Sequence, residues 1–508
     1  MSATILTSSV LGIDGHRVDV ECDISPGLPG FRIVGLPDTA VQEARERVRS
    51  AMRHSDLPFP RTKITINLAP ADLRKCGTGF DLPIAIAILT AHGDLPTQDP
   101  KRRLVVGELA LDGRLRPISG ALSTAILARD SSIEELIVPD VNAREASLVT
   151  DVPLCGAATL REVVEHIAGV KKIAAYERDG TVERPTGEDP LDFSGIRGQE
   201  RAKRALEIAA AGGHNVLLNG PPGAGKTLLA QSFRSILPEL TMDEAIEVTQ
   251  LHSVAGSLPQ DDVVSSRPFR SPHHSASSVS LVGGGAVPKP GEISLAHRGV
   301  LFLDEFPEFP RHVLEMLRQP LEDGRVTVAR VQGTVTFPAR FLLVAAMNPC
   351  PCGYATDPDQ QCVCAPMQTI AYRKRLSGPL LDRIDLLIDV PKVPPNRLIS
   401  LEEGESSAVV RDRVRKARER QRERAAVTGV GTNAELTSNQ VRRLIRLAPT
   451  ATEMMERAIA RYHLSARAYF RIIKVSQTIA DLAGFEQVDE SHVSEALCYR
   501  DLTATAAG

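Results

Sequence analysis

Residues 220–227 of the chain are Gly220-Pro221-Pro222-Gly223-Ala224-Gly225-Lys226-Thr227, and they directly follow the apolar run Val216-Leu217-Leu218. Glycines at this spacing let successive backbone N–H groups turn inward around a phosphate. We expect Lys226 to reach the β- and γ-phosphates of a nucleotide and the Thr227 hydroxyl to ligate Mg²⁺. A helix that begins near Lys226 adds its positive dipole end. Strand, loop and helix occur in the required order, which predicts a nucleotide-binding α/β domain.

The length and composition indicate a globular protein of several domains. The 508 residues leave room for about three domains of roughly 150 residues each. No apolar run approaches the roughly 18 residues that a membrane-spanning helix needs, and the N-terminus does not resemble a secretory signal. We therefore expect a cytoplasmic protein with no membrane role. The net charge is only −3, so contact with nucleic acid would depend on local basic patches.

A polar stretch divides the chain near residue 190. Residues 171–192 contain two glycines and two prolines and show no apolar period, so we interpret residues 169–192 as a linker. Residues 1–168 mix strand-like and helical patterns and predict an α/β domain of their own. The elements expected there are strands at 64–68, 104–106 and 136–138 and helices at 39–54 and 81–92.

Short apolar strands alternate with helices in residues 193–395. This pattern predicts a mainly parallel sheet with functional residues at the carboxyl ends of its strands. The strands are expected at 215–219, 299–303, 341–347 and 386–390. Residues 396–508 show only helical patterns, which predicts a C-terminal helical lid. Its helices are expected at 407–425, 437–447, 450–462, 466–482 and 490–497.

Three polar groups follow the later strands of the predicted sheet. Asp304 and Glu305 end the run Gly299-Val-Leu-Phe-Leu, and Asn348 ends the run at 341–347. We expect Asp304 to hold Mg²⁺, directly or through water, and Glu305 to polarise the attacking water. The Asn348 amide is expected to orient that water, although an asparagine that only ends a strand is the alternative. Arg383 precedes the strand at 386–390, where an isolated arginine is usually a surface cation.

Four cysteines lie within residues 350–364. Cys350, Cys352, Cys362 and Cys364 form a CxC-x9-CxC pattern directly after Asn348. Four thiolates this close together can provide a tetrahedral Zn²⁺ site that holds a loop with little apolar content. The spacing departs from the CxxC pairs that structural zinc sites favour. Reduced free thiols and a redox-labile pair therefore stay open as alternatives.

These motifs together resemble the AAA+ ATPases, and within them the magnesium-chelatase-like ComM/YifB family. The resemblance covers essentially the whole chain. It rests on GPPGAGKT, SPHHSAS (271–277), PGEISLAHRGVLFLDEF (290–306), NPCPCG (348–353) and SGPLLDRIDL (377–386). The family implies a ring, usually a hexamer, with ATP at the subunit interfaces. Arg383 matches its arginine finger and Arg467 resembles its lid arginine, and an arginine at the γ-phosphate is worth about 10³-fold or more in rate.

Two insertions point to a polymeric substrate. The segment around 267–285 resembles the helix-2 insert of this AAA+ branch. Alternating apolar residues on both sides of a glycine turn predict a hairpin over 324–337, with Arg330 and Gln332 at its tip. In ring ATPases of this branch such hairpins face the central pore, so Arg330 is expected to contact DNA phosphates. Contact with the adjacent subunit alone is the alternative.

A run of charge at 411–424 carries eight basic and three acidic residues. Such runs are usually solvated helix faces supported by i,i+4 pairs. A surface that guides DNA is the alternative.

The N-terminal region resembles the Lon-protease-like fold of ribosomal-protein-S5 type. Residues 75–81 occupy the place of Lon's serine loop, and residues 107–120 occupy the strand and turn before its lysine. Gly79 stands where the nucleophile would fall and Leu122 stands near the lysine's place. Without a hydroxyl and an amine there is no Ser-Lys pair. We expect this domain to be catalytically inactive and to serve as a scaffold or a DNA-docking module.

Three functions are compatible with these features. The first is a hexameric ATPase that moves on single-stranded or branched DNA, as a helicase or branch-migration factor in recombination or natural transformation. The second is a chaperone-like remodeller of proteins, but neither hairpin tip offers the usual aromatic residue. The third is a magnesium-chelatase subunit, for which no integrin-type domain is present. The first function is favoured.

Overall fold

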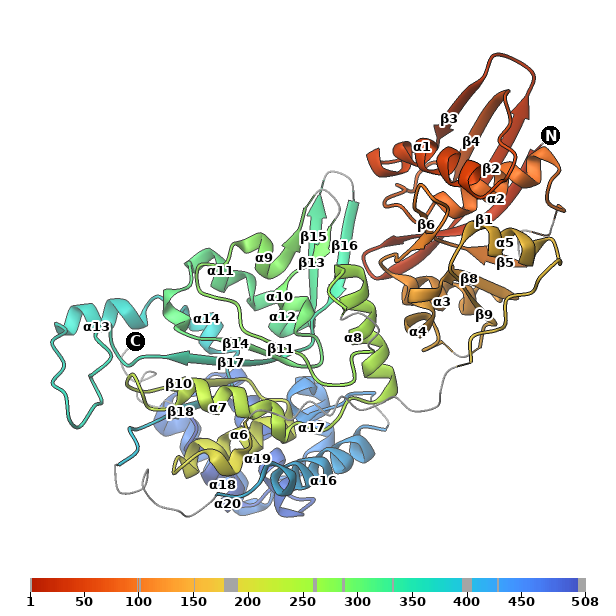
Figure 1. Cartoon of the computed structure of the whole chain (residues 1–508). Helices are drawn as coiled ribbons and strands as arrows, with labels where there is room; N and C mark the ends of the chain where they lie inside the picture. Colours follow the sequence, from red (N-terminus) through yellow and green to blue (C-terminus); the bar gives the residue numbers. More distant parts are fainter. Residues whose placement is uncertain are drawn as a thin grey trace.

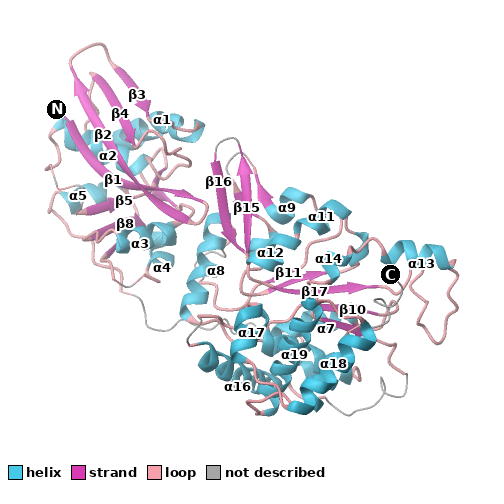
Figure 2. Cartoon of the chain, turned by 180° about the vertical axis from the view of Figure 1, so that it is seen from behind, coloured by secondary structure: helices cyan, strands magenta, loops and turns pink. Residues whose placement is uncertain are grey.

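The computed structural model describes residues 2–97, 99, 102–149, 151–177, 191–258, 263–285, 288–330, 333–394, 404–426 and 429–500. The chain forms two bodies (Figure 1). Strands and helices from β1 to α5 make up the first body. The second body contains a parallel sheet with helices on both sides, and the helices from α16 to α20 gather on one of those sides (Figure 2).

The N-terminal body is built on a seven-stranded mixed sheet in the order β3-β4-β2-β1-β5-β8-β9. Strands β1, β2 and β4 pair antiparallel, whereas β3 and the strands from β5 to β9 in this sheet pair parallel to their neighbours. The expected helices at 39–54 and 81–92 match α1 and α2. The strands are β1 (Ser2–Leu11), β2 (Asp14–Ser25), β3 (Gly30–Val34), β4 (Lys63–Ala69), β5 (Arg103–Val105), β6 (Glu108–Leu109), β7 (Leu115–Arg116), β8 (Glu135–Pro139) and β9 (Leu154–Ala157). The helices are α1 (Thr39–His54), α2 (Asp81–His92), α3 (Ala121–Asp130), α4 (Asp140–Ala146) and α5 (Leu160–Ile167).

Helix α2 is the centre of the N-terminal core because its sequence is apolar on every side. All residues from Asp81 to Ala91 are buried, as expected of a helix without a polar face. The predicted Lon-like landmarks lie beside it, with Gly79 just before α2 and Leu122 fully buried on α3. The Lon-like assignment of this region stays a prediction.

The second body is built on a five-stranded parallel sheet in the order β11-β14-β17-β10-β18. The strands are β10 (Val216–Asn219), β11 (Phe269–Arg270), β14 (Val300–Leu303), β17 (Leu342–Met347) and β18 (Leu386–Asp389). Residues alternate between two cores: Val300 and Phe302 pack on one face, while Leu301 and Leu303 pack on the other. Both faces are therefore covered, which explains why these strands are continuous apolar runs.

Helices and short strands cover and connect this sheet. They are η1 (Phe193–Gly195), α6 (Glu200–Gly212), α7 (Lys226–Ser232), η2 (Phe233–Ile236), α8 (Met242–Ala255), α9 (Ser278–Val282), β12 (Gly283–Gly284), β13 (Lys289–Pro290), α10 (Glu292–Leu295), η3 (Phe306–Glu308), α11 (Arg311–Met316), α12 (Arg318–Asp323), β15 (Arg325–Arg330), β16 (Gly333–Pro338), α13 (Pro366–Arg373) and α14 (Gly378–Leu381). The expected hairpin is confirmed as β15 paired antiparallel with β16.

The C-terminal region described here is helical, as expected. Its elements are α16 (Ser407–Ala425), η4 (Asn433–Glu435), α17 (Ser438–Leu444), α18 (Pro449–Tyr462), α19 (Ala466–Ala483) and α20 (Glu490–Leu497). Helix α17 is shorter than the predicted span of 437–447 because Ile445 adopts an extended backbone conformation. Thr437 starts this helix with a capping box in which Gln440 takes part.

Helix α16 shows that the run of basic residues has a structural role. Arg418 is buried and donates to the Ala210 carbonyl oxygen, and Arg411 donates to the Ser235 carbonyl oxygen. Arg424 forms an ion pair with the fully buried carboxylate of Asp481. Several arginines thus bind groups of α6, η2 and α19, and sequence alone does not reveal these distant partners. The predicted solvated face with i,i+4 pairs is also present, since the exposed Arg415 pairs with Glu419 and the exposed Lys416 pairs with Asp412.

The two bodies touch at several places. Gln250 of α8 donates to the Ile13 carbonyl oxygen at 2.6 Å, and the Gly120 N–H donates to Ser253 Oγ at 2.9 Å. At the turn between β1 and β2, a Cβ atom on Gly12 would lie only 2.7 Å from a methyl carbon of Val335 on β16. The N-terminal body therefore packs against both α8 and the hairpin, as the views show (Figures 1 and 2). Among the described residues, no helix combines the length and apolarity that crossing a membrane requires.

Candidate functional site

The predicted phosphate loop lies at the carboxyl end of β10, which lies between β17 and β18 in the sheet. Gly220 directly follows this strand, and a Cβ atom there would lie 2.2 Å from the Val390 carbonyl oxygen. Only glycine allows this close approach of the loop to the segment after β18. The loop then leads into α7, whose N-cap is Gly225. The predicted order of strand, loop and helix is therefore present.

Lys226 is the charged residue of this loop, and its side chain is buried. Its Nζ donates to the carbonyl oxygens of Gly220 and Pro221 at 2.7 and 3.0 Å, and to Asn348 Oδ1 at 3.1 Å. Burial lowers the pKa of Lys226, while the charge of Asp304 acts in the opposite direction. An ammonium group held among neutral oxygens favours an anionic ligand that supplies the missing charge.

The two predicted magnesium residues lie in contact. Thr227 Oγ1 donates to Asp304 Oδ2 at 2.9 Å, which joins the start of α7 to the end of β14. A hydroxyl and a carboxylate are hard oxygen donors of the type that Mg²⁺ prefers. The residues therefore fit a magnesium ion.

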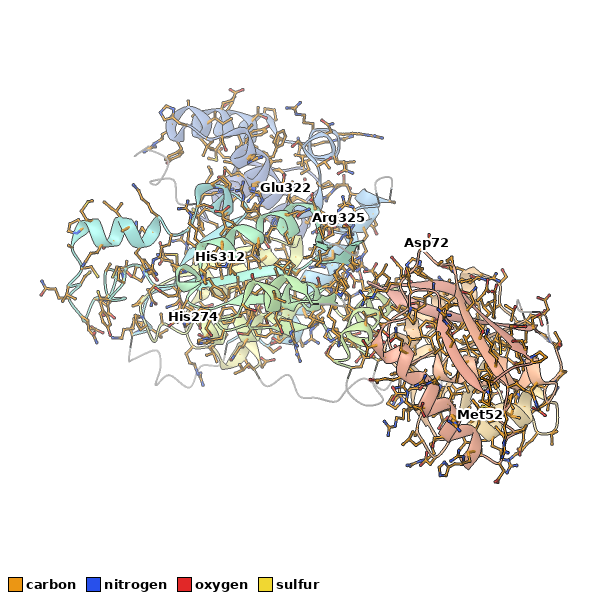
Figure 3. The ribbon with its side chains drawn as sticks, turned by 90° about the horizontal axis from the view of Figure 1, so that it is seen from above. Met52, Asp72, His274, His312, Glu322 and Arg325 are labelled. Carbon is orange, nitrogen blue, oxygen red and sulfur yellow. The ribbon has the colours of Figure 1, made fainter. Side chains whose placement is uncertain are left out.

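Glu305 has a backbone conformation that points to a special position. Its φ is +50°, which is uncommon for a residue with a side chain, and its N–H donates to Asp304 Oδ1 at 2.9 Å. The exposed Glu305 carboxylate forms an ion pair with His274 at 3.1 Å. His274 belongs to the SPHHSAS motif (271–277), and no role was predicted for this histidine from the sequence. Figure 3 labels His274 in the body that carries the phosphate loop, well apart from Met52 and Asp72 of the N-terminal body.

The two predicted arginines lie outside this cluster. Arg383 follows α14, donates to the Pro379 carbonyl oxygen at 2.7 Å and forms an ion pair with Glu322 of α12, which Figure 3 also labels. Arg467 is exposed in the first turn of α19, and the described residues give it no hydrogen bond or ion pair. The roles of Arg383 at a neighbouring subunit and of Arg467 in the lid stay predictions.

The hairpin buries one face and exposes the other. Val326, Val328, Val335 and Phe337 are buried, whereas the alternate residues Thr327 and Thr336 are exposed. Arg325 at the base of β15 is labelled in Figure 3. Arg330 ends β15 but its side chain is outside the description, and Gln332 lies outside the described residues. Their predicted contact with DNA is therefore not tested.

The four cysteines of the predicted zinc site converge. Their ligand atoms all lie within 4.8 Å of one another. Cys350 Sγ is 3.4 Å from Cys352 Sγ and 3.7 Å from Cys362 Sγ, and the Cys352–Cys362 distance is 3.6 Å. All eight cysteines of the chain are free thiols.

A buried network connects the sheet to the lid, and sequence analysis missed it. Asp385 accepts from the Asn215 N–H at 3.2 Å and forms ion pairs with His214 and Arg471. Burial alone would raise the pKa of Asp385, but His214 and Arg471 hold it well below its usual range. The sequence Asp382-Arg383-Ile384-Asp385 indicates a charged segment. It gives no local pattern for the partners of Asp385, because these are distant in the chain.

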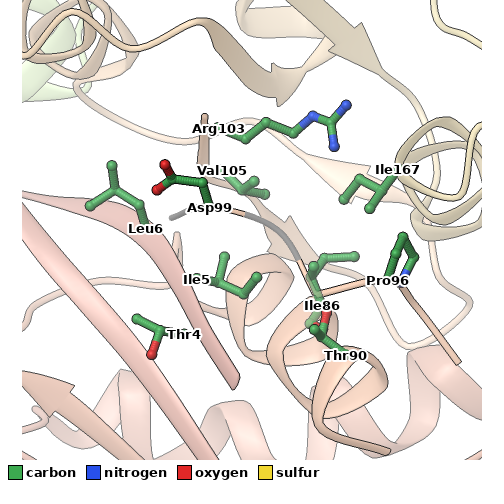
Figure 4. A pocket seen from close by; sticks show the side chains of 10 residues that line it. All are labelled: Thr4, Ile5, Leu6, Ile86, Thr90, Pro96, Asp99, Arg103, Val105 and Ile167. Carbon is green, nitrogen blue, oxygen red and sulfur yellow. The ribbon is translucent and has the colours of Figure 1, made fainter. Parts of the chain in front are cut away.

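A small pocket lies in the N-terminal body (Figure 4). It is lined mainly by apolar side chains, with Asp99 and Arg103 as its charged residues. None of the residues predicted for nucleotide binding contributes to it, so it is a feature of the N-terminal core.

The comparisons with known proteins cover all three regions of the chain. The family models that match are described as "Magnesium chelatase, subunit ChlI" at residues 192–398, "Subunit ChlI of Mg-chelatase" at 20–142 and "Magnesium chelatase, subunit ChlI C-terminal" at 404–500. The competence protein ComM of Haemophilus influenzae is 47% identical over 502 residues, which cover 98% of this chain and 97% of ComM. The chain belongs to the magnesium-chelatase-like ComM/YifB family. Escherichia coli YifB is 45% identical over 508 residues, with 98% of this chain and 97% of YifB covered.

The magnesium chelatases themselves are more distant. The 38 kDa magnesium-chelatase subunit of Rhodobacter capsulatus is 30% identical over 177 residues, which are 31% of this chain and 50% of that subunit. Membership of the ComM/YifB family makes the chain an AAA+ ATPase of magnesium-chelatase type, with ATP and Mg²⁺ as the implied cofactors and an oligomer as the implied assembly.

Proposed function

We propose that this chain is the subunit of a hexameric, cytoplasmic AAA+ ring that hydrolyses ATP to move on single-stranded or branched DNA. The observation that carries the proposal is the convergence of Lys226, Thr227, Asp304 and Asn348 at one edge of the parallel sheet. At this edge, groups that follow three different strands form two hydrogen-bonded pairs, Lys226 with Asn348 and Thr227 with Asp304. Phosphoryl transfer requires such a set of positioned charges more than it requires covalent chemistry.

Each residue has a role that its surroundings support. Lys226 would bind the β- and γ-phosphates in place of the carbonyl and amide oxygens it now contacts. Thr227 and Asp304 would hold Mg²⁺, which neutralises phosphate charge. Asn348 would orient the attacking water that Glu305 polarises. His274 contacts one carboxylate oxygen of Glu305 at 3.1 Å and would orient this carboxylate, whose other oxygen can accept a proton.

A second subunit completes the proposed site. The cluster formed by Lys226, Thr227, Asp304 and Glu305 contains no arginine, although charge develops on the phosphate oxygens during transfer. Arg383 would act on the nucleotide of the neighbouring subunit, and Arg467 would act on a bound nucleotide as the lid arginine. Arg383 must then exchange its ion pair with Glu322 for the nucleotide. Assembly of the ring would thereby become a condition of fast hydrolysis.

The proposal of DNA as the polymer rests on the hairpin and on the relatives. The exposed face of β15 and β16 carries small polar residues such as Thr327 and Thr336, and Arg330 and Gln332 would bind phosphates at the tip. The name of ComM refers to competence, which favours branch migration in recombination or natural transformation. A protein remodeller is the second candidate, and it would grip polypeptide at the same hairpin.

The test is an ATPase titration with the full-length protein. Hydrolysis should rise on addition of single-stranded or four-way-junction DNA, and the stimulation should fall steeply with salt because phosphate contacts release counterions. Glu305→Gln should lower kcat at least about 100-fold. Glu308→Gln, on the adjacent η3 helix and paired with Arg375, is the matched control and should retain most of the activity.

Two outcomes would separate the candidates. Stimulation by an unfolded protein but by no DNA structure, with hexamers verified by mass, would replace DNA by polypeptide as the substrate. Full activity in Glu305→Gln would overturn the assignment of the general base.

A further inference from the structure

The loop between β17 and α13 lacks the usual means of holding its shape. No helix or strand is present between Met347 and Pro366. The largest aliphatic side chain of this segment, Val363, is 84% exposed. Yet Cys350 within this loop is fully buried, and four sulfurs from both of its ends meet. A loop without an apolar core needs another source of free energy to hold two distant CxC pairs together.

The spacing of the sulfurs matches a single tetrahedral ion. A zinc–thiolate bond of about 2.3 Å implies sulfur–sulfur edges of about 3.8 Å in a tetrahedron. The observed separations are 3.4, 3.6 and 3.7 Å, and all four ligand atoms lie within 4.8 Å. An iron–sulfur cluster places several irons between its thiolates and needs a wider arrangement. In addition, the Cys352 N–H donates to Cys364 Sγ at 3.4 Å, and a hydrogen bond donated to sulfur favours the thiolate form of that cysteine.

The second cluster of possible ligands in the described chain is different. Glu135, Cys155 and His166 also lie together, but Glu135 forms ion pairs with Arg103 and His166. The other nitrogen of His166 accepts from the Ile173 N–H at 2.9 Å. These groups already satisfy one another. The four cysteines, by contrast, form a cluster that contains no basic or acidic residue, and their sulfur atoms contact one another.

The cysteine loop also touches the phosphate loop. Gly353 follows Cys352 with φ +88°, and a Cβ atom there would lie 2.7 Å from the ring of Pro222 and 3.9 Å from the Asn348 amide carbon. Asn348 itself is two residues before Cys350 and accepts a hydrogen bond from Lys226. The cysteine cluster therefore holds Gly353, whose backbone lies beside both Pro222 and Asn348.

We propose that Cys350, Cys352, Cys362 and Cys364 bind one Zn²⁺ as four thiolates, and that this ion holds Asn348 and the Pro222 side of the phosphate loop in place for ATP hydrolysis. Binding releases the four thiol protons and involves no change of oxidation state. The zinc site goes beyond the proposed function, whereas its coupling to hydrolysis rests on it. Zinc here would be structural, and its effect on the reaction would be transmitted through Asn348 and Pro222.

The metal is tested first, without use of the reaction. Full-length protein purified under reducing conditions should contain one zinc per chain by elemental analysis. After removal of the metal, Co²⁺ should give the visible bands of a tetrahedral thiolate site at one equivalent. Cys362→Ser should lose both signals, and Cys498→Ser, an exposed cysteine outside the cluster, should keep them. Absence of stoichiometric zinc and of the Co²⁺ bands in the wild-type protein would overturn the site.

The coupling is tested with a variant that keeps all four thiolates. Gly353→Ala places a methyl group against Pro222, so it should retain one zinc but lower kcat about 10- to 100-fold, as expected for a displaced catalytic loop. Gly378→Ala is the control, because nothing lies within 4 Å of its added methyl group. Metal-free wild-type protein should show a similar loss that zinc restores. Unchanged kcat in both Gly353→Ala and the metal-free protein would overturn the coupling.

Failure of the proposed function would give a different pattern. If the wild-type ring hydrolysed no ATP, elemental analysis and the Co²⁺ spectrum would still decide the zinc site. The coupling would then be decided by the affinity for a fluorescent ATP analogue, which Gly353→Ala should weaken and Gly378→Ala should not.

Discussion

The two large sheets of the described chain both pack against helices, but the polar and charged residues beside them differ in exposure. In the parallel sheet, polar side chains from β10, β14 and β17 meet at one edge, where Thr227 and Glu305 are exposed. In the mixed sheet of the N-terminal body, the comparable groups are buried and paired. Asp81, for example, is fully buried and receives two hydrogen bonds from Arg47 at 2.6 and 2.9 Å.

Strand direction explains part of this difference. All carboxyl ends of a parallel sheet lie at the same edge, so loops that follow successive strands converge there. In the N-terminal sheet β1, β2 and β4 alternate in direction, and their loops are divided between two edges. A pattern of alternating strands and helices is therefore not enough to bring functional side chains together, because the strands must also be parallel.

The largest expected effect contrasts two buried lysines. Lys226→Met should lower the ATPase kcat by up to about 1,000-fold, about 4 kcal/mol of barrier, because it removes a preorganised charge at the phosphates. Lys75→Met in the N-terminal body should instead change stability. Lys75 is fully buried and donates to the Pro70 carbonyl oxygen. Steady-state ATPase assays and urea unfolding of both variants provide the measurement.

The contrast would fail if the two variants behaved alike. A Lys75→Met protein that is folded, assembled and as inactive as Lys226→Met would show that the N-terminal body contributes directly to the reaction.

A smaller effect is expected where the parallel sheet joins the lid. Asp385→Asn should lower the free energy of unfolding by about 3 kcal/mol, because it leaves the buried His214 and the partly buried Arg471 without their carboxylate. Asp389→Asn is the control, since Asp389 is exposed at the carboxyl end of β18, the strand that Asp385 directly precedes. Equilibrium urea unfolding followed by circular dichroism gives both values. Equal stability of the two variants would contradict a structural role of the Asp385 network.

The smallest expected effect is at α8, where the two bodies meet. His297 and Arg298 donate hydrogen bonds to Glu247 and, against the effect of burial, lower its pKa to about 2. Because the folded pKa is depressed, the ion pair stabilises the protein above about pH 4.5, and this contribution is lost as the pH falls toward 2. Since Glu247 is about half exposed, Glu247→Gln should cost on the order of 1 kcal/mol at pH 7 after screening.

Urea unfolding at several pH values checks this last prediction. The difference between wild type and Glu247→Gln should shrink between pH 5 and pH 3. A difference that is constant over that range would assign the effect to packing and not to charge.

Sequence reasoning was most successful where the signal is local. The strands at 299–303 and 341–347 are apolar runs that end in polar residues, and they appear as β14 and β17 with Asp304 and Asn348 at their ends. Helix α16 begins and ends at the predicted residues. The grouping of Lys226, Thr227, Asp304 and Asn348 was also predictable, because parallel strands bring their carboxyl ends together.

What sequence reasoning missed depends on partners that are distant in the chain. The sequence around Asp385 does not predict its contact with Arg471, and the sequence around Glu305 does not predict its contact with His274. The charge run at 411–424 predicted a solvated face, yet the buried Arg418 binds a carbonyl oxygen of α6. Such contacts arise only when elements far apart in sequence are packed against one another.

The closeness of Gly12 to Val335 has a mechanical consequence. The turn between β1 and β2 lies against the side of β16 with no side chain of its own between the backbones, and Leu11 and Ile13 pack into the same core as the hairpin. A hairpin that tilts on its base must either push this turn or separate from it. Any displacement of the hairpin would therefore be felt by the seven-stranded sheet through this contact, where Gly12 has no side chain that could change rotamer to absorb it.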